Sequence, residues 1–135
     1  MHTKNSCYTY FRIVGDFEPD YVSELLNLKP EKSWKMGDIR CNGTRYDFAS
    51  WEIGRCDDYE TEVAKQMRNT ISLLLDKIDL LNKIREENDV KFYLEIVPSV
   101  YVEEATPCLA PSLDIIDFCH ATRTELDIDM YICNS

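Results

Sequence analysis

Four segments carry the pattern of apolar residues that is typical of sheet strands. Residues 7–14 are rich in aromatic and β-branched types and end at a Gly-Asp turn signal. Residues 48–53 form a second extended run, which closes at Gly54. Residues 90–97 and 126–132 alternate apolar and polar positions, and the last segment shows the period of two expected of a half-buried antiparallel strand. The pattern therefore predicts four or more strands.

Apolar residues at steps of three and four predict helices between these strands. One helix is expected to begin at Pro19 and to stop at Asn27 and Pro30. Residues 58–87 carry a single apolar stripe and are compatible with one long helix or with two, since Asp76 or Asp79 could cap a second segment. The stripe consists of Val63, Met67, Ile71, Leu74, Ile78 and Leu81.

A further helix is expected after the proline-containing connection at 107–111. Ser112 can cap it, and it should continue to about Arg123. Its inward face consists either of Leu113, Ile116 and Cys119 or of Ile115 and Phe118. By contrast, residues 29–47 hold Pro30, Gly37 and Gly43 among polar residues, which indicates a long irregular connection with a short strand around Trp34.

The order of these elements is strand, helix, strand, long helical segment, strand, helix, strand. This order favours one α+β domain over residues 1–135, a two-layer sandwich with two β-α-β-like halves. The sheet should be mostly antiparallel with four or more strands. Helices should cover one face only, because the strands alternate and are not continuous apolar runs.

The charge of the chain narrows the classes of partner. Lys and Arg number 15 against 25 Asp and Glu, which gives a formal net charge of −10. Such a charge repels phosphate backbones and anionic lipid, so we expect neither nucleic acid nor membrane as a partner. The same charge favours association with a basic protein, although solubility is the plainer explanation of an acidic surface. The chain also lacks a signal-peptide-like apolar region, which predicts a cytoplasmic location.

The cysteines, histidines and glycines of the chain do not have the spacing that metal, cofactor or catalytic sites require. Six cysteines show no CxxC spacing, so we expect reduced thiols. A zinc site of Cys108, Cys119, His120 and Cys133 would lack the closely spaced ligand pairs of structural zinc sites, and no metal is predicted. The four glycines show no phosphate-binding spacing, and the two histidines suggest no catalytic triad. We therefore predict no cofactor and no catalytic residues.

The polar positions of the predicted strands suggest a binding face. If the strands are neighbours, tyrosines and charged residues gather on one side of the sheet, a combination favoured at contact surfaces. An ordinary solvated sheet face is the alternative interpretation. The positions are Tyr8, Tyr10, Arg12, Tyr93, Glu95, Asp127, Asp129 and Tyr131.

Two smaller candidates lie within or beside that face. Asp127 and Asp129 are two residues apart on one strand, hence about 7 Å from each other on one face, which is a spacing compatible with paired-carboxylate hydrolysis. Solvated carboxylates are the alternative, because acid catalysis requires a desolvated carboxyl. Trp34 and Trp51 could line a pocket beneath the 29–47 connection, with core packing of both indoles as the alternative.

Several short motifs resemble a bacterial family, domain of unknown function 4279 (DUF4279). They are Y-x-Y-F-R-I-x-G-D-F-x-P from Tyr8 to Pro19, L-x-x-K-P ending at Pro30, W-x-x-G from Trp34 to Gly37, the single Trp51, and D-I-D-M-Y from Asp127 to Tyr131. Their order covers nearly the whole chain. The resemblance implies an α+β fold of four or more strands, and it implies no activity.

The sequence thus favours a non-enzymatic cytosolic protein-interaction domain. One specific hypothesis is an immunity-type protein that neutralises a basic toxin, which the small size and strong acidity of the chain suggest. The alternative is a small-ligand sensor or a hydrolase that uses carboxylates near Asp127 and Asp129. A homodimer that closes the second sheet face is a third hypothesis.

Overall fold

A computed structural model describes residues 4–134 of the chain. Within these residues the strands are β1 (Ser6–Asp16), β2 (Lys32–Trp34), β3 (Ala49–Cys56), β4 (Asp89–Tyr101), β5 (Thr124–Ile128) and β6 (Tyr131–Cys133). The helices are α1 (Pro19–Leu26), α2 (Ala64–Ile71), α3 (Ile78–Glu87) and α4 (Leu113–Thr122). The α+β class and the predicted order of the main elements are confirmed.

The strands form one mixed sheet in the order β2-β3-β1-β4-β5, and β6 pairs with β4 beyond the end of β5. The β2–β3, β3–β1 and β1–β4 pairs are antiparallel, whereas β5 and β6 run parallel to β4. The prediction of a mostly antiparallel sheet is confirmed. Only the second half is a parallel β-α-β unit, because α4 carries the chain back before β5 begins; β1 and β3 are antiparallel neighbours.

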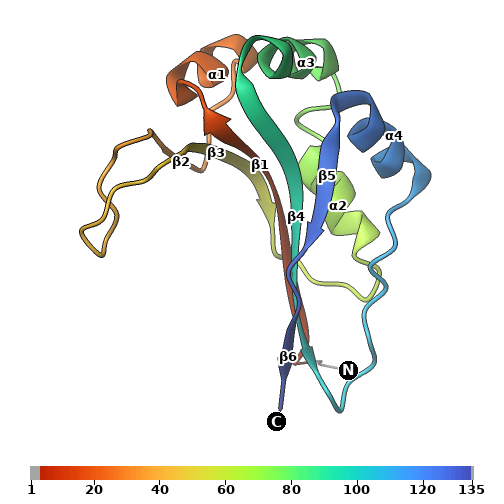
Figure 1. Cartoon of the computed structure of the whole chain (residues 1–135). Coiled ribbons are helices and arrows are strands. Elements are labelled where there is room, and N and C mark those ends of the chain that lie inside the picture. Colours follow the sequence, from red (N-terminus) through yellow and green to blue (C-terminus); the bar gives the residue numbers. More distant parts are fainter. Residues whose placement is uncertain (1–3, 135) are drawn as a thin grey trace.

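The helices lie on one side of the sheet (Figure 1). The α2 helix contacts β1 and β3, and α4 lies beside β5. The inward strand positions form the core with these helices, and their largest fully buried side chains include Trp51, Phe11, Phe92 and Leu94. The Trp51 indole N–H donates to Ser23 Oγ on α1 at 2.9 Å, so its polar atom is satisfied inside the core.

The helical segment 58–87 is two helices with a break between them. Backbone turns close the break, with Leu74 N–H donating to Ile71 O at 2.8 Å and Lys77 N–H to Leu74 O at 3.0 Å. The second helix starts after Lys77, and neither Asp76 nor Asp79 occupies its N-cap position. The predicted stripe is nevertheless correct, because all its members except the partly buried Ile78 are buried.

The two alternatives for α4 are resolved in favour of Ile115 and Phe118. Both side chains are buried, whereas Leu113 is 77% exposed. Cys119 is buried beside them. The helix therefore turns a narrow apolar stripe to the sheet and leaves Ile116 exposed.

The prediction for residues 126–132 is wrong in two respects. The segment is two short strands parallel to β4, and its alternating apolar residues are exposed, with Ile128 at 48% and Ile132 at 64%. The crossover through α4 sets the parallel direction. The strands also occupy the sheet edge, where the helix layer does not cover their apolar face, so an alternating pattern is present without burial.

Residues 35–47, here called the arm, form the irregular connection predicted between the first helix and the second main strand. The arm projects away from the sheet on the side opposite the helices (Figure 1). Tyr46 stacks on Trp34 with ring centroids 4.2 Å apart, and Arg40 lies over Tyr46 at 4.5 Å. These aromatic contacts hold the base of the arm together, and the short strand predicted around Trp34 is β2.

Candidate functional site

The side of the sheet away from the helices, here called the open face, carries the polar positions of the central strands. Strand alternation turns Tyr10 and Arg12 of β1 to this face while Phe11 and Ile13 enter the core. On β4 the same alternation places Tyr93 on the open face. Five residues of the predicted set, Tyr10, Arg12, Tyr93, Glu95 and Asp127, are thus brought together on adjacent strands.

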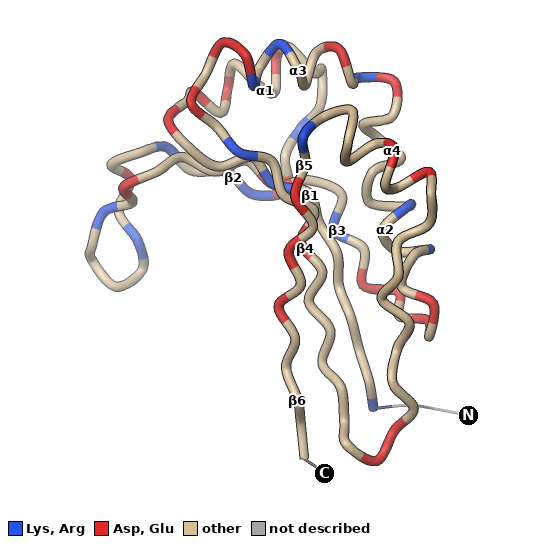
Figure 2. The backbone as a smooth tube through the Cα atoms, turned by 45° about the vertical axis from the view of Figure 1, so that its right-hand side comes forward, with Lys and Arg blue, Asp and Glu red and all other residues tan. Residues whose placement is uncertain are grey.

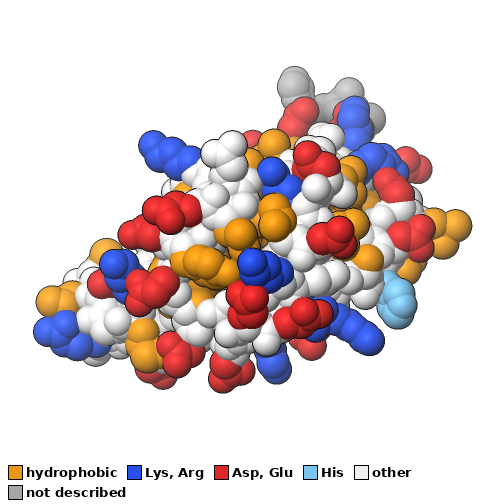
Figure 3. All heavy atoms as spheres, turned by 90° about the horizontal axis from the view of Figure 1, so that it is seen from above, with side chains coloured by type: hydrophobic (Ala, Val, Ile, Leu, Met, Phe, Trp, Pro, Cys, Tyr) orange, Lys and Arg blue, Asp and Glu red, His pale blue; other side chains and the backbone are white. Residues whose placement is uncertain are grey.

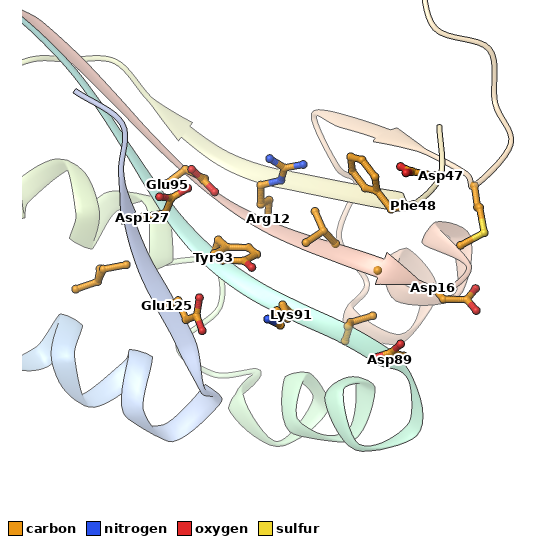
Figure 4. Close-up of a pocket in the computed structure, with 15 residues that line it drawn as sticks. Arg12, Asp16, Asp47, Phe48, Asp89, Lys91, Tyr93, Glu95, Glu125 and Asp127 are labelled. Atoms are coloured by element: carbon orange, nitrogen blue, oxygen red, sulfur yellow. The ribbon is translucent and has the colours of Figure 1, made fainter. Parts of the chain in front are cut away.

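A cavity of about 790 Å³ lies on the open face between the arm and β5 (Figure 4). Its floor includes Arg12 of β1 and Tyr93 of β4, and Phe48 stands at the arm end. Asp127 of β5 stands at the opposite end beside Glu95 of β4 (Figure 4). The cavity therefore spans the sheet from the arm to the β5 edge, and we call it the groove.

Cross-strand register explains why these side chains meet. Tyr10, Glu95 and Asp127 occupy one row across β1, β4 and β5. Arg12 and Tyr93 are opposite each other in the next row. Directly opposed residues have Cβ atoms about 5 Å apart, which is within reach of these side chains.

Glu95 is the most perturbed acid of the groove. Its side chain is only 6% exposed, and burial raises its pKa to about 8. A hydrogen bond with Asp127 and the negative charges of Asp127 and Asp129 act in the same direction, whereas Arg12 opposes them. At neutral pH Glu95 therefore retains its proton in most molecules.

Tyr10 and Arg12 lie beside this pair. Burial raises the pKa of Tyr10 to about 12, and the carboxylates of Glu95 and Glu52 contribute to the rise. Tyr10 therefore stays a neutral phenol that can donate or accept a hydrogen bond. The Nε atom of Arg12 is buried and has no hydrogen-bond partner among the described residues.

Carboxyl groups dominate the groove lining. Six acidic residues line it against two basic ones, Arg12 and Lys91. The acidic residues are Asp16, Asp47, Asp89, Glu95, Glu125 and Asp127. This ratio exceeds that of the chain as a whole, which has 25 acidic and 15 basic residues. The groove therefore concentrates negative charge.

Several of the other basic residues lie on the arm. Figure 2 shows acidic residues along β5 and basic residues on the arm. Seen from above, the arm forms one end of the molecule and displays basic and hydrophobic side chains (Figure 3). Among the latter, Met36 and Ile39 are exposed.

Four residues of the predicted set share the open face but do not line the groove, namely Tyr8, Tyr10, Asp129 and Tyr131. Tyr8 stacks with Tyr10 at 6.1 Å and is covered by the Arg55 guanidinium at 3.9 Å. The Tyr131 hydroxyl donates to Asp129 Oδ2 at 3.2 Å. Tyr8, Asp129 and Tyr131 therefore extend the polar surface toward β6 without lining the cavity.

The two tryptophans do not share a pocket. Trp34 is paired with Ser50, and Trp51 is paired with Ser33. Paired residues share a face and successive residues point to opposite faces, so the two indoles lie on opposite faces of the sheet. Trp51 is completely buried, which corrects its place among the candidate binding residues. Trp34 is half-buried, donates to Phe48 O at 3.0 Å and supports the arm.

The predicted set also omits residues that the structure places in the groove. Lys91 is on the same side of its strand as Tyr93 and Glu95, and Glu125 is on the same side as Asp127, because residues two apart on a strand share a face. The period of two in the sequence therefore suffices to place both residues on the open face. Phe48 and Met36 reach the groove because the arm lies next to it. No local sequence pattern indicates that contact.

A paired-carboxylate mechanism that uses Asp127 with Asp129 lacks a desolvated acid. Both side chains are exposed. The desolvated carboxyl is Glu95, which is on the neighbouring strand and was predicted only as a binding residue. The pair that combines a desolvated carboxyl with a solvated one is therefore Glu95 with Asp127.

The chain belongs to the family described as domain of unknown function (DUF4279), whose model matches residues 5–133. No curated protein and no solved structure matches it. Within the described residues, no helix is both long and apolar enough to cross a bilayer. The family membership confirms the resemblance carried by the short motifs and assigns no activity.

Proposed function

We propose that this chain is a binding domain whose groove holds a basic side chain of a partner protein. The observation that carries it is the excess of six acidic over two basic residues in the groove lining. An ammonium or guanidinium group at the Glu95–Asp127 pair would meet two carboxyl groups of one sheet row, both of which line the groove. Tyr93 provides aromatic contact area at the same place.

An immunity-type protein that neutralises a basic toxin is the most specific form of this function. The net charge of −10 would attract such a toxin over long range, and the groove would then select a basic side chain. Six unpaired cysteines suit the reducing cytoplasm, where we place this activity. Cells that express a basic toxin encoded beside this chain should survive when the chain is supplied, and unchanged survival would contradict the role.

A fluorescein-labelled tetralysine peptide tests the groove directly. Fluorescence anisotropy at low salt would compare the wild type with the E95Q/D127N double variant. We expect the double variant to bind at least about tenfold more weakly, since charged hydrogen bonds to both carboxyl groups are lost.

The D57N/D58N variant is the matched control for this experiment. Asp57 and Asp58 are exposed acidic residues outside the groove, and their substitution removes at least as much charge. We expect its affinity to stay within about twofold of the wild type. Equal losses in both variants would show that tetralysine responds to net charge alone, and would overturn the function.

A second candidate function is supported by Arg12. Its buried Nε atom, which has no partner among the described residues, could donate to the carboxylate of a small ligand in the groove. A thermal-shift screen of small carboxylic acids distinguishes this candidate. A rise in Tm that is lost in Arg12→Gln would support it, whereas no rise with any acid would remove it.

A further inference from the structure

The β5 edge of the sheet has no strand beyond it among the described residues. Residues 125–129 are all exposed. Asp129 N–H donates inward to Ile96 O of β4 at 2.9 Å. Since backbone groups alternate in direction along an extended strand, those of Leu126 and Ile128 face outward. The edge thus offers backbone donors and acceptors to an added strand.

The side chains on the two sides of this edge differ in character. Glu125 and Asp127 line the groove on the open face. Leu126 and Ile128 pair with Leu94 and Ile96, whose side chains are in the core, so both lie on the helix side, and Leu126 also borders the groove. An added strand would therefore meet carboxylates on one face and apolar side chains on the other.

The α4 helix extends the apolar side. Ile116 of α4 and Leu126 of β5 line one shallow depression, which also contains Cys119. Both Ile116 and Leu126 are exposed. Apolar side chains of an added strand would cover them and continue the sheet–helix core by one strand.

We infer that the β5 edge binds an extended segment of the partner, as an added strand in which basic and apolar residues alternate. The inference deepens the proposed function and rests on it. Basic residues of the segment would point toward Glu125 and Asp127, and the apolar ones would cover Leu126 and Ile128. The strand has 5 residues, so the paired stretch is about 16 Å long at about 3.3 Å per residue.

Charge decides between this occupant and a second copy of the chain. Pairing two β5 edges would bring Glu125 and Asp127 of one copy close to the same carboxylates of the other, and opposed like charges destabilise a strand pair. A segment with alternating basic residues has no such conflict. The basic partner segment is therefore the favoured occupant.

The probe for this inference is a short fluorescein-labelled peptide in which lysine and valine alternate. A strand turns the N–H groups of every second residue toward its neighbour. Two matched peptides, N-methylated either on all lysines or on all valines, therefore block opposite edges of the added strand. We expect one N-methylated peptide to lose at least about tenfold in affinity and the other to stay within about threefold.

Hydrogen exchange gives a second readout on the unmodified protein. Strand addition should slow exchange of the Leu126 and Ile128 amides at least about tenfold when the alternating peptide is bound. Ile128 is exposed in the free chain, so its replacement should not disturb folding, which circular dichroism would check. The Ile128→Lys variant should bind the peptide more weakly. A peptide of the same composition, with the lysines and valines in separate blocks, should also bind more weakly.

Three outcomes would overturn strand addition. Equal affinities of the two N-methylated peptides, or Leu126 and Ile128 amides that stay unprotected, would each contradict it. A homodimer by light scattering that Ile128→Lys abolishes would show a second copy on the edge, with the same consequence. If alternating-peptide binding still requires Glu95 and Asp127 while N-methylation has no effect, strand addition fails and the proposed function stands.

Discussion

Glu95 is the residue at which the open face differs most from a solvated sheet surface. It is almost fully buried, pairs with Asp127 across two strands, and has its pKa raised to about 8. Ordinary solvated carboxylates are ionised at neutral pH. The raised pKa therefore marks a position where a bound cation would change the protonation state of the protein.

The pH dependence of stability should report this carboxyl. In the unfolded chain Glu95 returns to its ordinary pKa, so the folded state binds the proton more tightly. Its stabilising contribution is complete below the unfolded pKa and is lost as pH rises through about 8. Urea unfolding of the wild type and Glu95→Gln at a series of pH values should show a decline over this window that is weaker in the variant. Parallel curves would contradict the assignment.

Residue patterns predicted the polar positions well and their environment poorly. The period of two placed Glu95 on the face of Tyr93, but the pKa of Glu95 depends on its burial and on Asp127 and Arg12, which belong to other strands. Likewise, the sequence allows the same two interpretations for Trp34 and Trp51, a pocket lining or core packing. Only the pairing of β2 with β3 reveals that one indole supports the arm and the other fills the core.

At the scale of elements, the contact between β3 and α2 holds the open face in place from behind. Gly54 in β3 has a positive φ of 76°, and an added Cβ would be 2.5 Å from Thr70 O of α2. Thr70 Oγ1 also donates to Gly54 O at 2.7 Å and shares a 2.7 Å hydrogen bond with Thr9 of β1. The absence of a side chain at Gly54 allows the helix to approach the sheet this closely.

Gly54→Ala should therefore destabilise the fold more than the backbone conformation alone explains. Gly43 in the arm is a matched control, since its φ is 84° and nothing lies within 4 Å of an added Cβ. We expect Gly43→Ala to lower the free energy of unfolding by about 1 kcal/mol and Gly54→Ala by about 1–3 kcal/mol more. Urea unfolding measures both, and equal losses would contradict the close packing.

Element types were predictable where the pattern was long, and strand directions were not. The stripe from Val63 to Leu81 predicted the buried helical face even though the break at residues 72–77 was left open. The segment 126–132 alternates as an antiparallel strand would, yet α4 returns the chain parallel to β4. Alternation of apolar and polar residues shows that the two faces of a strand differ. It does not indicate whether the strand runs parallel or antiparallel to its neighbour, or which element covers the apolar face.

At the scale of the whole molecule, the net charge of −10 and the acidic groove should act together on association. Long-range attraction is screened by salt, with a Debye length of about 10 Å at 0.1 M, whereas contacts inside the groove are screened less. Stopped-flow association of the tetralysine probe should therefore slow strongly with salt, while dissociation changes less. An association rate that does not respond to salt would contradict electrostatic steering.

Proton release on binding tests the central claim most directly. If a cationic group binds at the Glu95–Asp127 pair, its charge lowers the pKa of Glu95, which then releases its proton at neutral pH. Calorimetric titration of tetralysine in two buffers of different ionisation enthalpy measures this release. We predict a buffer-dependent heat for the wild type and a loss of that dependence in Glu95→Gln. The same heat in both buffers for the wild type would show that the probe binds away from this pair.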